Sequence, residues 1–100
     1  MTELFPFDMF IENMTHSEKA VLRIAAEKVH RAQLKIKNLG SVNTQEKAEE
    51  LEKHEREIER AIGMAEAIAL TSEVFDNTTD ATKLLYEVQR NEKLREMLYK

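Results

Sequence analysis

The second half of the chain changes character within one continuous helical pattern. Residues 46–60 carry seven acidic and four basic side chains, whereas residues 61–75 are apolar on nearly every helical face. A helix that is apolar all round has to be covered by other helices or by another chain. The pattern therefore predicts an all-helical fold with a surface for self-association or for a partner, but it does not predict a reaction.

The spacing of apolar residues predicts three long helices. Apolar positions recur three and four residues apart over 15–39, where Thr15 begins a capping-box sequence, and the same spacing continues over 44–75 and 80–98. Gly40 supplies the residue that ends the first helix. The connection to the second helix is short, so we expect the first two helices to pack antiparallel. The third helix is expected to turn back alongside the apolar end of the second.

The first 14 residues form an apolar arm with a composition of its own. Three of the four phenylalanines lie here, and Pro6 favours a short helix that begins at or after that residue. The arm either caps the helices of its own chain, inserts into a partner, or exchanges between two copies. We favour packing on the same chain, because each buried phenylalanine stabilises a fold by about 1.5–3 kcal/mol.

We expect a single helical domain over residues 1–100: a three-helix antiparallel bundle with a long central helix, a short N-terminal aromatic arm and a second copy as dimer partner. A chain of 100 residues buries a modest core, so a second copy would help to stabilise it. Gly63, among alanines, marks either dense packing within one chain or a dimer seam. The predicted partner or dimer surface combines the arm with the end of the middle helix: Phe5, Phe7, Phe10, Met14, Met64, Ile68, Leu70 and Phe75.

The first helix is basic, with six basic residues against two acidic ones. In an antiparallel hairpin it lies beside the acidic start of the second helix, so we expect ion pairs between the two. The alternative is contact with nucleic-acid phosphates, which no aromatic residue among the basic ones assists and which the net charge of −4 disfavours. The candidate phosphate contacts are Lys28, Arg31, Lys35 and Lys37.

Carboxylates and histidines at helical spacing raise the question of a metal site. Glu27 and His30 have the spacing of one half of a ferritin-like dimetal site, and Glu50, His54 and Glu57 share a face of the second helix. One chain holds a single such pair, so a complete site would require a dimer. We expect no metal, no cofactor and no catalysis, since the chain also has no cysteine and no phosphate-binding glycine loop.

These observations favour a small non-enzymatic regulator or inhibitor that occupies a surface on another macromolecule, acting as a homodimer on a protein partner. With no cysteine, no signal-peptide pattern and no apolar run long enough to span a bilayer, we expect a cytoplasmic protein without a membrane partner. The alternatives are a nucleic-acid-binding regulator that uses the basic first helix and a dimeric dimetal helical-bundle protein. A steep loss of DNA affinity with salt would favour the first alternative, and stoichiometric iron or zinc would favour the second.

Overall fold

The computed structural model describes residues 7–72, 75 and 77–99, and every regular element in these ranges is an α-helix. This confirms the all-helical fold that the apolar spacing predicts. Among the described helices, none combines the length and the apolar character that crossing a membrane requires. The elements are α1 (Phe7–Asn13), α2 (His16–Leu39), α3 (Gln45–Thr71), α4 (Thr78–Arg90) and α5 (Glu92–Leu98).

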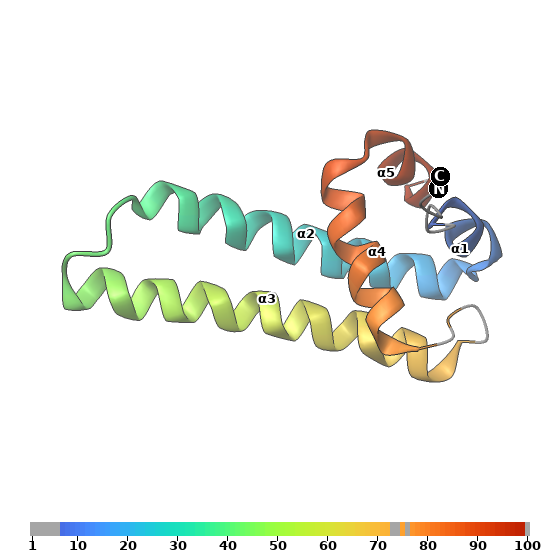
Figure 1. The fold of residues 1–100 in the computed structure, drawn as a ribbon, viewed down its shortest axis with the longest axis horizontal. Coiled ribbons are helices and arrows are strands. Elements are labelled where there is room, and N and C mark those ends of the chain that lie inside the picture. The colour runs from blue at the N-terminus through green and yellow to red at the C-terminus, as the bar shows by residue number, and fades with distance from the viewer. Residues whose placement is uncertain (1–6, 73–74, 76, 100) are drawn as a thin grey trace, which may run out of the picture.

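Helices α2 and α3 lie side by side along the longest dimension of the molecule, joined by a short connection (Figure 1). The capping box that starts α2 is complete: the backbone N–H of Glu18 donates to the Thr15 hydroxyl at 3.1 Å, and the backbone N–H of Thr15 donates to the Glu18 carboxylate at 2.8 Å. Gly40 ends the helix with a φ of 65°, a conformation that glycine adopts without steric cost. Thr44 then caps α3, accepting from the Lys47 backbone at 3.2 Å.

The helix expected over residues 80–98 is two helices in the structure. Asn91 leaves the helical region with φ −110° and ψ 105°, while its backbone N–H still closes α4 on the Glu87 carbonyl at 2.9 Å. Its side chain accepts from the backbone N–H of Leu94 at 3.3 Å and so caps α5. Short polar side chains compete with the backbone in this way, which is why asparagine interrupts the run.

The small helices gather at one end of the α2–α3 pair. Figure 1 shows α4 crossing the pair rather than running alongside α3, with α5 and α1 beyond it. The expected alongside placement of the third helix is therefore not what the structure has. Because α4 turns across the pair, the far half of the hairpin consists of two helices alone.

The core lies where all five helices meet. Its fully buried larger side chains come from four helices and include Ile11, Leu22, Leu84, Leu85 and Leu98. Phe10 of α1 contacts Phe75, with ring centroids 5.0 Å apart, and Phe7 meets Phe10 edge-on at 6.4 Å. The described part of the arm therefore packs on its own chain, against α5 and against Phe75, which follows α3. Phe5 lies outside the described residues.

The apolar end of α3 is covered on only part of its circumference. Ala61, Ala65 and Ile68 are buried, whereas Gly63 and Ala67 are exposed. A side-chain carbon added at Gly63 would meet nothing within 4 Å. No helix of the same chain therefore packs closely against Gly63, and this face of α3 is open.

Candidate functional site

An apolar groove runs between α2 and α3, and we call it the α2–α3 groove. Val21 and Ala26 lie on opposite sides of the core-facing residues of α2. Helix α4 covers the Ala26 side, where the Gln89 side chain donates to the Ala26 carbonyl. The groove therefore lies on the face of the hairpin away from α4. Its walls are mainly apolar and consist of Ser17, Glu18, Val21, Met64, Ala67, Ile68 and Thr71.

The structure divides the predicted partner surface into two parts. Met64 and Ile68 line the groove. Leu70 lies about one helical turn after Ala67 and is 78% exposed. Met14 and Phe75 are buried in the core, and Phe7 and Phe10 are half-buried against it. Phe7, Phe10 and Phe75 belong to the inside of this chain because α1 folds back onto Phe75. Among the predicted residues that the structure describes, Met64 and Leu70 are the α3 residues that leave apolar surface open.

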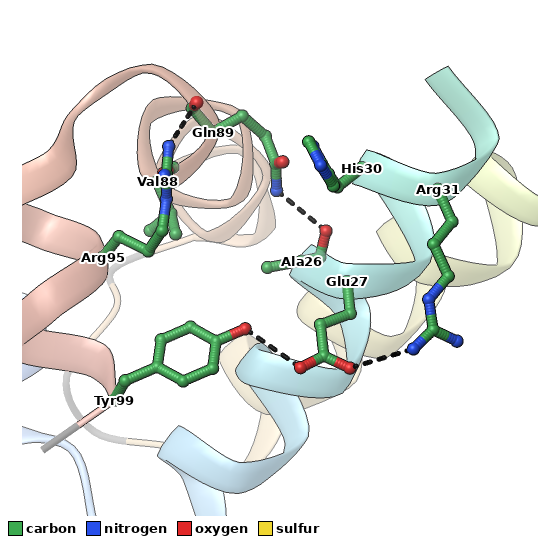
Figure 2. A pocket seen from close by; sticks show the side chains of 8 residues that line it. All are labelled: Ala26, Glu27, His30, Arg31, Val88, Gln89, Arg95 and Tyr99. Carbon is green, nitrogen blue, oxygen red and sulfur yellow. Dashed lines mark hydrogen bonds and ion pairs between the residues drawn. The ribbon is translucent and has the colours of Figure 1, made fainter. Parts of the chain in front are cut away.

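A second, more polar depression lies where α4 and α5 meet α2, and we call it the interhelix pocket (Figure 2). Its volume is about 170 Å³. Val88 and Ala26, both almost fully buried, give it an apolar floor. The full lining is Ala26, Glu27, His30, Arg31, Val88, Gln89, Arg95 and Tyr99.

Hydrogen bonds between helices hold the walls of the interhelix pocket. The Tyr99 hydroxyl donates to Glu27 Oε1 at 3.2 Å, and the Gln89 side-chain amide donates to the Ala26 carbonyl at 3.0 Å (Figure 2). Arg95 donates from Nη2 to the Gln89 carbonyl at 2.8 Å and from Nε to the Val88 carbonyl at 3.4 Å. The guanidinium thereby satisfies carbonyls at the end of α4 that no helical N–H reaches.

The charges around the interhelix pocket are predominantly positive. Arg31 approaches Glu27 Oε2 at 3.7 Å, with the two side chains 71% and 50% exposed, so this ion pair contributes little to stability. The Arg23 guanidinium carbon lies 6.0 Å from the centre of the Tyr99 ring. Burial of the hydroxyl, and then its bond to Glu27, raise the pKa of Tyr99, so it stays a neutral donor.

The basic residues of α2 do not form the predicted ion pairs with α3. Each of the four ion pairs among the described residues joins two residues of one helix, three or four positions apart. Lys28, Arg31, Lys35 and Lys37 are all exposed. The first three are spaced so that they share a face, whereas Lys37 points elsewhere. The basic stripe of α2 is therefore not neutralised across the hairpin.

His54 is buried in the α2–α3 seam, and its Nδ1 has no hydrogen-bond partner. Its Nε2 lies 3.9 Å from Glu50, one turn earlier on the same helix. Among the described residues, no three histidine or carboxylate side chains come together as a metal site would require. The structure thus shows His54 as a seam residue with one weak partner.

Sequence reasoning missed the residues that complete the interhelix pocket. Glu27 and His30 attract attention by their spacing, but Tyr99 lies 72 residues from Glu27 and no local pattern joins them. Comparison with the known protein families, with curated proteins and with solved structures finds no match to this chain.

Proposed function

We propose that the protein is a non-enzymatic helical binding protein that assembles as a homodimer, with the α2–α3 groove of each copy against that of the other. The observation that carries this proposal is the apolar strip of Val21, Met64 and Ala67, which lies open above the buried Ile68. Ile24, 49% exposed, and Leu70, 78% exposed, extend it on either side. Covering such a strip removes apolar surface from water, which favours association.

Charge complementarity supports a second copy as the occupant. Helix α2 is basic and exposed, and the start of α3 over residues 46–60 carries seven acidic and four basic side chains. If two hairpins pack face to face about a twofold axis parallel to the helices, α2 of one copy lies on α3 of the other. That arrangement sets the basic helix beside the acidic one, as a four-helix bundle. Gly63 and Ala67 present no bulk against close approach.

The oligomeric state tests this proposal. Sedimentation equilibrium of the full chain should show a dimer, and the exposed-site variants Ala67→Glu and Leu70→Glu should dissociate it while circular dichroism shows unchanged helix content. Leu34→Glu is the matched control, because Leu34 is also exposed but lies one turn beyond His30, on the pocket side of α2. A wild-type chain that remains monomeric at several hundred micromolar would refute the dimer.

A wider proposal concerns regulation. We propose that the dimer acts as a regulator or inhibitor by occupying a surface of another protein. Leu34 and Val42, each 46% exposed outside the groove, support this because they leave apolar side chains available to a partner. Leu34→Glu and Val42→Glu should then abolish the effect of overproducing the protein in its host without changing the dimer. An effect that survives both changes would reject these residues as the contact.

Nucleic-acid binding is a second candidate because the basic stripe of α2 is exposed and forms no described ion pair with α3. Phosphate contacts by Lys28, Arg31 and Lys35 would make the affinity for duplex DNA fall steeply with salt. The variant Lys28→Gln/Lys35→Gln should bind more weakly and with a shallower salt dependence. Equal binding by this variant and the wild type would exclude the stripe as a phosphate site.

A further inference from the structure

We propose that the far half of the α2–α3 hairpin opens on its own, with α2 and α3 parting there while the five-helix end stays folded. We call this half the hairpin tip and define it as residues 34–59, all of which the structure describes. It begins beyond Ala32 on α2 and ends before Ala61 on α3, two residues with no exposed surface. Only α2 and α3 run through the hairpin tip (Figure 1), and the inference does not rest on the homodimer.

The hairpin tip buries no apolar side chain completely. Its seam residues Ile36, Leu39, Leu51 and Ile58 are half-buried. At the five-helix end, by contrast, a residue such as Leu84 has no exposed surface. Because the stabilisation from an apolar side chain grows with the area removed from water, the seam of the hairpin tip holds its two helices together weakly.

The one buried side chain of the hairpin tip is that of His54, and its Nδ1 has no hydrogen-bond partner. Its Nε2 lies 3.9 Å from Glu50, whose side chain is 63% exposed. A buried polar atom without a partner disfavours the closed seam, and opening returns that atom to water. A surface depression of about 420 Å³ adjoins His54, with Lys35 and Asn38 on its α2 side, so apolar contacts do not seal the seam there.

No side-chain hydrogen bond or ion pair found in the hairpin tip, all of which the structure describes, joins its two helices. The ion pair between Arg56 and Glu52, at 2.6 Å, lies within α3. Lys47 donates to the Ser41 carbonyl of the connection at 3.5 Å. These bonds can persist when α2 and α3 separate, so opening breaks no polar side-chain bond between the helices.

Opening changes the surface that the hairpin tip presents. The closed seam half-covers Ile36, Leu39, Leu51 and Ile58, whereas the open form exposes them as one apolar row on each helix. Segments with few buried apolar contacts open at the lowest free energies in a protein. The hairpin tip is therefore a conformational device that hides an apolar surface when closed and exposes it when open.

Native-state hydrogen exchange of the full-length protein, followed by NMR at two protein concentrations, tests this inference. The tip amides of Ile36 and Leu51 should exchange at least about a hundredfold faster than the end amides of Leu22 and Leu85, which exchange only through global unfolding. We expect this difference at both concentrations and also in a chain that sediments as a monomer. Failure of this inference is therefore distinguishable from failure of the homodimer.

Three variants locate the opening. Val88→Ala weakens the five-helix end, so it should speed exchange of the end amides and leave the tip amides unchanged. His54→Leu should slow exchange of the tip amides about tenfold or more, because leucine needs no hydrogen-bond partner. Glu55→Gln, at the exposed next position, is the matched control and should have no effect. Equal protection of tip and end amides, an equal effect of Val88→Ala on both, or equal effects of His54→Leu and Glu55→Gln would each overturn the proposal.

Discussion

Replacing Ile11 by alanine should destabilise the protein strongly, because the described part of the N-terminal arm belongs to the core. Ile11 is fully buried in α1, and α1 packs on α5. Shortening a buried isoleucine to alanine costs about 2–5 kcal/mol, from lost transfer free energy and from the cavity left behind. Domains of this size have about 5–15 kcal/mol of stability in all, so the change would remove a large share of it.

Thermal unfolding followed by circular dichroism measures this effect at a fixed protein concentration. Each kcal/mol corresponds to about 4–8 °C for a domain of 60–100 residues, so the midpoint should fall by at least about 10 °C. Met9→Ala is the matched control, since Met9 lies on the same helix but is exposed. If Ile11→Ala and Met9→Ala melted together near the wild-type temperature, α1 would be detached in solution and the packing argument would be refuted.

Three further predictions follow from single side chains. Thr15→Ala should lower the free energy of unfolding by about 0.5–2 kcal/mol in urea titrations, because it removes the cap of α2, whereas Ser41→Ala in the exposed connection should not. His54→Leu should raise it, since leucine removes a buried nitrogen that has no partner; a less stable variant would contradict this. Hydrogen bonds from Ser72 and then Thr15 lower the pKa of Glu18 below 4.5. The stabilisation from these bonds is therefore complete above that pH and is lost as the pH falls through the lowered pKa. Glu18→Gln should make the free energy of unfolding fall less steeply over this acidic range.

The sequence predicts the long helices well because their signals are local. The step of three and four residues marks α2 and α3, and the capping box at Thr15 forms as its spacing requires. The break at Asn91 is harder to predict, since one asparagine within an apolar-periodic run is compatible with an exposed helical position. What decides it is the bond from the Leu94 backbone to the Asn91 side chain, which starts α5 in a new direction.

The interhelix pocket could be predicted only in fragments, because it is assembled from distant segments. The spacing of Glu27 and His30 shows that they share a side of α2, but only the fold brings Tyr99 and Arg95 to that side. The contact of Phe75 could not be predicted either, because it involves a residue far away in the sequence. The apolar pattern predicts only that Phe75 ends the second helix. Its role as the contact for Phe10 depends on how α1 returns to the core.

The far half of the hairpin is where the chain supports itself least. Ile36, Leu39 and Leu51 are only half-buried there, and the seam includes the unpartnered nitrogen of His54. Helices owe most of their stability in proteins to tertiary packing, so a two-helix segment opens at lower free energy than the five-helix end. This weak half also carries basic residues on α2 and acidic residues on α3 without ion pairs between them. A second copy that packs along the hairpin from the α2–α3 groove would therefore also cover the part of the fold that one chain stabilises least.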